Sequence, residues 1–301
     1  MDYFNYNGKI YKADTPVIGA DSRGLRYGDG VFETLKIKMG KLILANEHFA
    51  RLWKGRDPAD IRARMQELHA FTAGNSTIKS AFDMALYDLA AKNQNQPLYK
   101  YLGGIKRSVE TDMTIGIGSP EDMTSIAIKY KQQGASILKI KLGKKPETDI
   151  ERISQIRKAV GDTMKIRIDA NQGWTFEEAI YCLNEMSDLD IEFCEQPMRT
   201  WYDDYLPELR NKTSIKIMAD ESCYNHHDAR KLIKSNACDL INIKFAKSGG
   251  INEGLEIHKI ANDSAIPCMI GSMLESRIAL SANLHFAYAC PNIKFFDLDT
   301  C

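Results

Sequence analysis

The sequence KIRIDANQGW, residues 165–174, is a short run of alternating apolar and charged side chains that reaches a carboxylate at Asp169. Such a run predicts a buried β-strand whose last inward side chain is acidic. Two further runs have the same form, since IEFCEQP reaches Glu195 and IKIMADES reaches Asp220. The three acids are about 25 residues apart, which is one strand plus one helix, so in a parallel barrel they would meet at one rim. Three carboxylates on a rigid rim suit a hard divalent cation such as Mg²⁺.

The same alternation of strand-like and helix-like segments continues from Glu110 to Asp299. The expected strands are DMTIGIG, ILKIKLG, KIRIDAN, IEFCEQP, IKIMADE, DLINIKF, IPCMIGS and IKFFDLD. Amphipathic stretches such as TDIERISQIRKAVGD lie between them. Eight such units predict an α/β protein with a (β/α)8-type barrel. Because the sequence stops directly after the eighth strand, we expect a C-terminally truncated barrel without a closing helix.

The composition excludes several classes of protein. The chain has 301 residues, 44% of them hydrophobic, which is enough for a large core. Forty basic residues balance forty acidic ones, so no net field attracts nucleic acid or an anionic membrane. Seven cysteines are scattered and form no C-x-x-C pair, which favours a reducing compartment. The N-terminus has no signal-peptide pattern, so we expect a cytoplasmic protein.

Lysines at strand ends are the candidate acid/base groups. Lys139 and Lys141 are two residues apart on one strand, so both should face the barrel interior. Burial and mutual repulsion predict lowered pKa values for both, although a solvent-facing pair remains the alternative. Lys244 ends a strand on the opposite side of the ring, with Lys247 just beyond it. Lysines on strands two and six would flank a metal held by strands three to five, an arrangement suited to moving a proton between two faces of a carbon.

Residues from about 57 to 299 resemble the muconate-lactonising subgroup of the enolase superfamily, and most closely its dipeptide epimerases of the L-Ala-D/L-Glu type. The shared wording is LKIKLG, IRIDANQGW, CEQP, MADES, NIKFAKSGGI, GSMLES and FFDLD. The resemblance implies an enolase-like (β/α)7β barrel and an Mg²⁺-dependent isomerase that transfers a proton between two lysines through an enediolate. The implied Mg²⁺ ligands are Asp169, Glu195 and Asp220. The implied acid/base catalysts are Lys141 and Lys244, with Lys139 assisting at the substrate carboxylate.

Two aspartates near the C-terminus are candidate substrate ligands. Asp297 and Asp299 in FFDLD are two residues apart and so should face the same way. Dipeptide epimerases have a matching D-x-D that binds the ammonium group of the dipeptide, and we expect the same role here. The alternative is that one of the two merely caps the chain end. Ser272, in GSMLES at another strand end, is expected to line the substrate pocket.

The N-terminal third of the sequence lacks the regular alternation of strand-like and helix-like segments seen in the rest. Residues 1–55 alternate short strands with Gly and Asp turns, which predicts a small antiparallel β segment. RGLRYGDGVFETLKI followed by EHFARL resembles the start of class IV pyridoxal-phosphate aminotransferases and aminodeoxychorismate lyases, where Arg51 would contact the cofactor phosphate. No counterpart of their Schiff-base lysine follows, so a transaminase has no nucleophile here. Residues 56–107 are expected to be helical, a remnant standing in place of the usual capping domain, with Asp83 and Asp88 on a partly solvated face. Residues 108–301 form the expected barrel domain.

Three functions remain open at this point. The first is Mg²⁺-dependent epimerisation of a dipeptide. The second is another enolase-type reaction, such as racemisation of an N-acylamino acid or a cycloisomerisation. The third is a fusion product, catalytically impaired by its altered cap, with only a binding or structural role. In the first two cases the partner is a small-molecule substrate, with no nucleic acid or membrane, and a homo-oligomer is left open.

Overall fold

The computed structural model of the chain describes residues 3–6, 9–12, 37–38, 41–42, 50–53 and 55–299. Near the N-terminus, β1 (Tyr3–Tyr6) pairs antiparallel with β2 (Lys9–Lys12), and β3 (Ile37–Lys38) pairs antiparallel with β4 (Lys41–Leu42). These pairs agree with the antiparallel strands expected near the N-terminus. The helix α2 (Ala50–Trp53) then leads toward the helical part of the chain.

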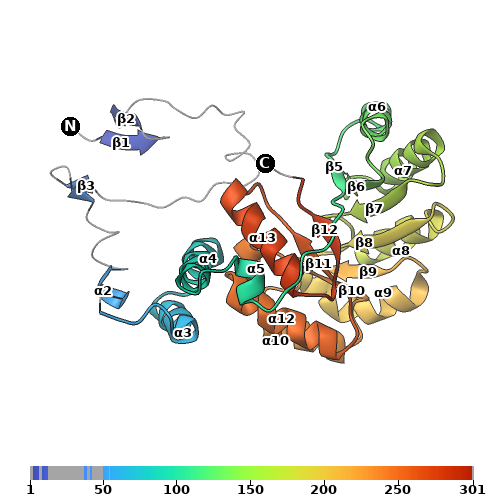
Figure 1. Cartoon of the computed structure of the whole chain (residues 1–301). Helices are drawn as coiled ribbons and strands as arrows, with labels where there is room; N and C mark the ends of the chain where they lie inside the picture. Colours follow the sequence, from blue (N-terminus) through green and yellow to red (C-terminus); the bar gives the residue numbers. More distant parts are fainter. Residues whose placement is uncertain are drawn as a thin grey trace.

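Eight parallel strands form the main sheet, and each pairs with its neighbours in the sequence (Figure 1). The strands are β5 (Met113–Ile115), β6 (Ile137–Lys141), β7 (Lys165–Asp169), β8 (Ile191–Glu195), β9 (Ile217–Ala219), β10 (Leu240–Ile243), β11 (Cys268–Gly271) and β12 (Ile293–Asp297). This order confirms the predicted (β/α)8-type arrangement of parallel strands. The carboxyl ends of all eight strands therefore lie at one rim.

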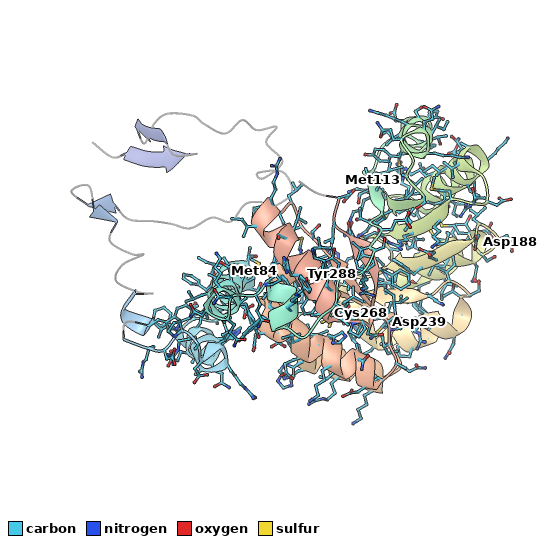
Figure 2. The ribbon with its side chains drawn as sticks, in the orientation of Figure 1. Met84, Met113, Asp188, Asp239, Cys268 and Tyr288 are labelled. Atoms are coloured by element: carbon cyan, nitrogen blue, oxygen red, sulfur yellow. The ribbon has the colours of Figure 1, made fainter. Side chains whose placement is uncertain are left out.

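Helices surround the sheet on its outer side, and side chains fill the space between the two (Figure 2). The helices are α6 (Pro120–Gln132), α7 (Pro146–Val160), α8 (Phe176–Glu185), α9 (Leu206–Lys212), α10 (His226–Lys234), α11 (Phe245–Ser248), α12 (Ile251–Asp263) and α13 (Arg277–Ala289), with the 3-10 turn η2 (Thr200–Tyr205) before α9. Capping boxes begin α8 at Thr175 and α10 at Asn225. None of the described helices combines the length and apolar character that crossing a membrane requires.

Side chains as well as backbone groups join the first strand to the last. One bond joins two backbone groups, since the Asp112 N–H donates to the Phe296 carbonyl over 3.2 Å. The Thr114 N–H donates to the Asp299 carboxylate over 2.6 Å, and the Leu298 N–H donates to the Thr111 hydroxyl over 2.8 Å. These three bonds form what we call the seam, and they bring β5 and β12 together to close the ring.

The lower part of the barrel interior is mainly apolar, and the guanidinium of the buried Arg167 lies over two of its rings, those of Phe193 and Phe295. Side chains alternate between the two faces of each strand, so every second residue points inward. One inward set packs into a separate buried cluster, which we call the floor: Phe193, Met218, Leu240 and Met269, with Phe295 partly buried against them. The rings of Phe193 and Phe295 meet edge to face with centroids 5.2 Å apart. The floor closes the barrel beneath the strand ends, where the inward residues become charged.

Three helices precede the barrel in the described part of the chain: α3 (Ile61–Phe71), α4 (Ser76–Asn93) and α5 (Leu98–Tyr101). The helix α4 packs against α11 and α12, and α5 packs against α13 (Figure 1). The expectation of a partly solvated face is correct for Asp88, which is exposed and pairs with Lys92 over 2.6 Å. It is wrong for Asp83, which is 0% exposed because α12 covers it and takes its carboxylate as a helix cap.

Replacing Phe193 with alanine should destabilise the protein by about 3–5 kcal/mol, because truncating a fully buried ring leaves a cavity that the rigid strands cannot fill. Urea unfolding of the two proteins measures the difference. Tyr181→Ala is the matched control, since Tyr181 is 45% exposed, and it should change stability by less than about 0.5 kcal/mol. Equal losses for both variants would contradict the assignment of Phe193 to the floor.

Candidate active site

The three predicted metal ligands lie on neighbouring strands at the same rim. Asp169 is the last residue of β7, Glu195 is the last residue of β8, and Asp220 directly follows β9. Asp169 and Glu195 are register partners across the two strands. All three are buried, with at most 2% exposure. The sequence spacing thus places the acids in one row, which we call the acid row, with Glu195 in the middle.

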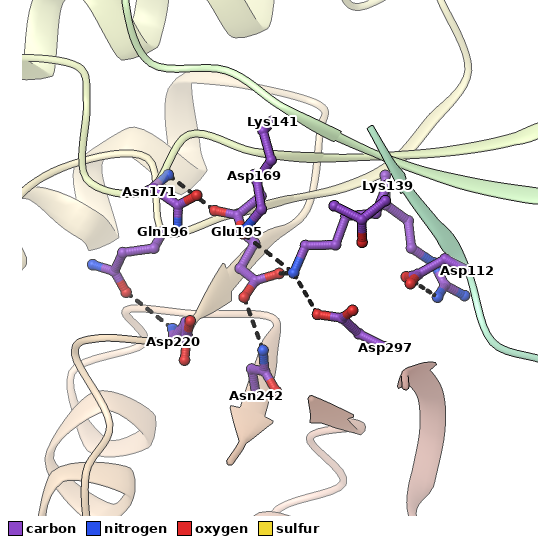
Figure 3. Close-up of polar contacts among 12 residues, drawn as sticks. Asp112, Lys139, Lys141, Asp169, Asn171, Glu195, Gln196, Asp220, Asn242 and Asp297 are labelled. Carbon is purple, nitrogen blue, oxygen red and sulfur yellow. Dashed lines mark hydrogen bonds and ion pairs between the residues drawn. The ribbon is translucent and has the colours of Figure 1, made fainter. Parts of the chain in front are cut away.

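Lys139 lies at the centre of the site and contacts three carboxylates at once (Figure 3). Its Nζ atom is 2.6 Å from Glu195 Oε2, 2.7 Å from Asp297 Oδ2 and 3.2 Å from Asp169 Oδ2. The side chain is only 1% exposed. A fully buried ammonium group would be very unfavourable alone, so these carboxylates hold it in place.

The other two lysines approach the acid row from its two ends. Lys141, on β6, places Nζ 2.6 Å from Asp169 Oδ2. Lys244, directly after β10, places Nζ 2.8 Å from Asp220 Oδ2 and 3.7 Å from Glu195 Oε1. In the eight-stranded ring β6 and β10 are four positions apart, so they lie opposite one another. Chemical groups bound between them would have an amine on each side.

The pKa values of the buried lysines do not follow the sequence expectation. Burial by itself would lower the pKa of Lys139, but Asp297, Glu195 and Asp169 outweigh it and raise that pKa well above the ordinary value. The predicted lowering is therefore wrong for Lys139. Burial likewise opposes the charge on Lys244, yet Asp220 and Glu195 raise its pKa above the ordinary range. For Lys139 and Lys244, attraction to the nearby carboxylates therefore outweighs both burial and repulsion between the lysines.

The acids of the row respond unequally to the same surroundings. Burial and repulsion from Asp169 raise the pKa of Glu195 to about 8. Burial would also raise the pKa of Asp169, but Lys141 and Lys139 reverse its effect and hold that pKa at about 2. For Asp220, Lys244 and Lys247 outweigh burial and keep the pKa well below its usual range. The middle carboxylate is thus the one least compensated by positive charge.

The acid row fits a divalent cation in its chemistry. Its donors are carboxylate oxygens, which Mg²⁺ prefers. Glu195 Oε2 is buried and, although it contacts the Lys139 ammonium, no hydrogen bond is aligned with it. That oxygen is therefore a buried acceptor without a hydrogen bond, as a metal ligand would be before the ion binds. Lysine ammonium groups contact the carboxylates of the acid row. A bound cation would therefore share these carboxylates with the lysines.

A second group of acids lies beside Lys139. The carboxylates of Asp112, Asp297 and Asp299 offer oxygens within 4.8 Å of one another, a spacing that Asp169, Glu195 and Asp220 do not share in the described structure. Burial and repulsion from Asp297 raise the pKa of Asp112 to about 7. Asp112 Oδ1 has no hydrogen-bond partner. Lys139 and Arg167 offset part of the negative charge of this group, and its remaining carboxylate oxygens suit a cationic ligand.

Two of the three predicted substrate ligands, Asp297 and Asp299, belong to this group, and the third, Ser272, contacts it. Asp297 Oδ2 pairs with Lys139, while its carbonyl accepts a bond from the Ser272 hydroxyl over 2.9 Å. The Asp299 carboxylate accepts from the Thr114 N–H in the seam. Asp299 is therefore a structural as well as a candidate binding residue. Ser272 contacts the backbone of the D-x-D segment, and its hydroxyl helps to position Asp297.

Several residues of the site were not identified from the sequence. Asn242 donates from Nδ2 to Glu195 Oε1 over 2.8 Å, and the side chain of Gln196 accepts from the Asp220 N–H over 2.9 Å. Arg167 donates to Asp112 over 2.8 Å from below the site. Asn242 could have been found, because it lies two residues before Lys244 and so faces the same way. Nothing local marks Asp112 or Gln196.

A parallel barrel with an acidic row flanked by lysines from opposite strands defines an enolase-type barrel. A family model for enolase C-terminal domain-like proteins matches residues 122–301, and one for the N-terminal domain of mandelate racemase and muconate lactonizing enzymes matches residues 24–103. The chain belongs to this family of the enolase superfamily. The N-terminal match crosses the boundary that we expected at residue 55.

Two of the similar relatives are dipeptide-type epimerases, and a less similar one, at 33% identity over 78% of this chain, is the N-succinyl-L-Arg/Lys racemase of Bacillus cereus. The D-Ala-D/L-Ala epimerase of Cytophaga hutchinsonii is 41% identical over 263 residues, which are 87% of this chain and 72% of the relative. The hydrophobic dipeptide epimerase of Enterococcus faecalis is 38% identical over 298 residues, which are 97% of this chain and 84% of the relative. The resemblance to dipeptide epimerases is thereby confirmed.

Solved structures give the same picture. The Cytophaga hutchinsonii dipeptide epimerase, complexed with Mg and D-Ala-L-Val, superposes with a TM-score of 0.79 at 42% identity over 80% of this chain and 66% of that one. The Enterococcus faecalis dipeptide epimerase, complexed with Mg and L-Leu-L-Tyr, gives a TM-score of 0.81 at 38% identity over 84% of this chain and 73% of that one. The comparisons do not support the aminotransferase resemblance, and the side chain of Arg51 lies outside the described residues.

Replacing Lys139 with methionine should destabilise the protein by about 3–5 kcal/mol near neutral pH, because three carboxylates would lose their shared buried cation. Without the ammonium group the folded-state pKa values of those acids rise. An acid with a raised folded pKa costs stability as the pH increases, so the deficit should shrink when the pH falls from about 8 to about 5. Urea unfolding at several pH values measures both effects.

The control for this experiment is Lys212→Met. Lys212 is 49% exposed and pairs with Glu208 on the surface of α9, so its loss should matter by less than about 0.5 kcal/mol at every pH. If the Lys139 variant were equally insensitive to pH, the buried charge balance described here would be incorrect.

Proposed function

We propose that this protein catalyses the Mg²⁺-dependent epimerisation of a dipeptide. The observation that carries the proposal is the position of Lys141 and Lys244 at the two ends of one acid row. A substrate carbon held over the row would face an amine on either side. Removing its α-proton on one side and returning a proton on the other inverts the configuration.

Asp169, Glu195 and Asp220 would hold the metal ion. Bound Mg²⁺ would stabilise the negative charge that develops on the substrate carboxylate and, by sharing the carboxylates of the row, would make the neighbouring lysines easier to deprotonate. Lys139 would add a fixed positive charge beside that carboxylate. It lies among three carboxylates and not at an end of the acid row, so we assign it an electrostatic role and not that of either opposed base.

Lys141 and Lys244 would then exchange roles with the direction of the reaction. For one epimer Lys141 is the base and Lys244 the acid, and for the other epimer the roles are reversed. Lys141 is 26% exposed and Lys244 is 6% exposed at the side chain. The intermediate between the two proton transfers is an enediolate of the substrate carboxylate, as the family resemblance implies.

The second acid group favours a substrate with a free ammonium group. Asp297 and Asp299, with Asp112 close by, form a cluster of carboxylates beside the proposed site of the substrate carboxylate. A dipeptide carries both a carboxylate and an α-ammonium group, whereas an N-acylated amino acid lacks the α-ammonium group. The dipeptides complexed in the solved relatives support the same choice.

The six buried, unpaired cysteines of the described residues support our expectation of a reducing, cytoplasmic setting.

A set of dipeptides incubated with the protein in D₂O should gain one mass unit at the α-carbon when Mg²⁺ is present. Chelation of the metal should abolish the gain, because the enediolate charge would lose its principal stabilising partner. Mass spectrometry measures the incorporation, and an N-acetylated copy of the best dipeptide is the control. Exchange only with the N-acetylated compound would favour the N-acylamino acid racemase alternative, and no exchange with any dipeptide despite bound Mg²⁺ would reject the proposal.

Lys141→Ala and Lys244→Ala should each reduce epimerisation by about 10²–10⁴-fold. Each variant should nevertheless keep α-proton exchange for one epimer only, because the remaining lysine still removes and returns a proton on its own face. NMR in D₂O, with each epimer supplied separately, measures this selectivity. Lys144→Ala is the control, since Lys144 is exposed and three residues beyond Lys141. Loss of exchange with the same epimer in both lysine variants would contradict the opposed geometry.

A further inference from the structure

A buried carboxylate from the helical N-terminal part caps a helix of the barrel. Asp83 lies in α4 and is 0% exposed. Its Oδ2 atom accepts a short hydrogen bond from the Ile251 N–H, and both of its oxygens lie 3.3 Å from the Asn252 nitrogen. These N–H groups open the helix α12, whose own N-cap residue, Gly250, has no side chain to satisfy them. We call this contact the clasp.

The clasp is tightly packed. Gly250 has a φ angle of +122°, which residues other than glycine rarely adopt. A Cβ atom at this position would lie 2.3 Å from Asp83 Oδ2. A second bond runs parallel to it, since the Thr77 hydroxyl of α4 donates to the Ala246 carbonyl over 3.1 Å. The position of α4 therefore fixes the segment between Ala246 and Ile251 from both ends.

The segment held by the clasp is the one that carries Lys244. The Lys244 carbonyl accepts from the Lys247 N–H over 3.0 Å, from the Ser248 N–H over 2.8 Å and from the Ser248 hydroxyl over 3.0 Å. The turn α11 that follows Lys244 is thus bonded directly to the backbone of that residue. Movement of α11 would be transmitted to Lys244 without passing through a flexible linker.

The same turn supplies a second cation to the acid row. Lys247 Nζ is 2.7 Å from Asp220 Oδ1 and 3.0 Å from the Asn242 carbonyl, while Lys244 holds Asp220 Oδ2. Both oxygens of Asp220 are therefore oriented by lysines of one short segment, Lys244 directly before α11 and Lys247 within it. Displacement of this turn would disturb the Lys244 end of the row.

The opposite end has a separate support. Asp149 Oδ2 accepts from the Gly143 N–H over 2.9 Å and from the Lys144 N–H over 3.1 Å, just beyond Lys141. The indole N–H of Trp174 donates to the same oxygen over 3.0 Å. None of these contacts involves α4, so the loop that follows Lys141 does not depend on the clasp.

We propose that Asp83 is a positioning residue for Lys244, so that the helical N-terminal part controls proton transfer on one face of the substrate only. This inference rests on the proposed function, because it takes Lys244 to be the acid/base group of that face. Asp83 acts through α11 and touches no reacting atom. Its loss should therefore slow one half of the proton transfer and spare the other.

The test is α-proton exchange in D₂O by Asp83→Asn, with each epimer of an active dipeptide supplied separately. Lys141→Ala and Lys244→Ala first establish which epimer each lysine serves. In Asp83→Asn, exchange of the Lys244 epimer should fall about 10–100-fold, the effect of a small misplacement of a reacting group. Exchange of the Lys141 epimer, measured at saturating Mg²⁺ so that a disturbed Asp220 limits neither face, should change by less than about 3-fold. Asp88→Asn, on the exposed face of the same helix, should leave both rates unchanged.

Two further variants guard against a general folding defect. Gly250→Ala should show the same selectivity, because its Cβ would displace the Asp83 carboxylate. Thr77→Val removes only the parallel bond at an exposed residue and should show a weaker form of it, about 3-fold. If Asp83→Asn does not fold, these two variants decide the question. Equal losses for both epimers, or no loss for either, would overturn the inference, whereas absence of exchange in the unmodified protein would instead reject the proposed function.

Discussion

The charge balance around Lys139 is the interaction on which the rest of the site depends. Its ammonium group joins carboxylates from the neighbouring strands β7 and β8 to one from β12, the last strand of the sheet. Asp169 and Asp297, two of its three carboxylate partners, keep low pKa values partly because Lys139 is there, and they in turn favour the charged form of the lysine. Neither side can be removed without leaving the other uncompensated.

The same balance explains how a dry barrel can serve a charged substrate. The floor of Phe193, Met218, Leu240 and Met269 excludes water below the acid row. Above it, positive and negative groups are paired within about 3 Å and largely neutralise one another. A metal ion and a substrate carboxylate would enter together as opposite charges and exchange partners with groups already in place. The protein would not have to create new buried charge at each turnover.

Much of this arrangement follows from local sequence. The near-25-residue spacing of Asp169, Glu195 and Asp220 identified one rim, and the two-residue period of strands identified Lys139 and Lys141 as inward-facing. The pKa of Lys139 was misjudged, because repulsion between lysines is visible in a pair of neighbours, whereas attraction to Asp297 is a contact between residues 158 apart. Asp83 was misjudged for the same reason, since its partner Ile251 is 168 residues away. Contacts across the ring leave no periodic pattern in the chain.

The seam has a consequence for how the molecule assembles. Each strand from β5 to β12 pairs with a neighbour nearby in the chain, so these pairings close short loops at modest entropic cost. The bond between Thr114 and Asp299 instead closes a loop of 185 residues. We expect it to form late on the folding route, because non-local contacts repay their cost only after the rest has condensed. During synthesis on the ribosome, a nascent chain could therefore form most of the barrel before β12 joins it. Until then Lys139 would lack its ion-pair partner Asp297, and the buried charges of the barrel would be paired only when this last strand is added.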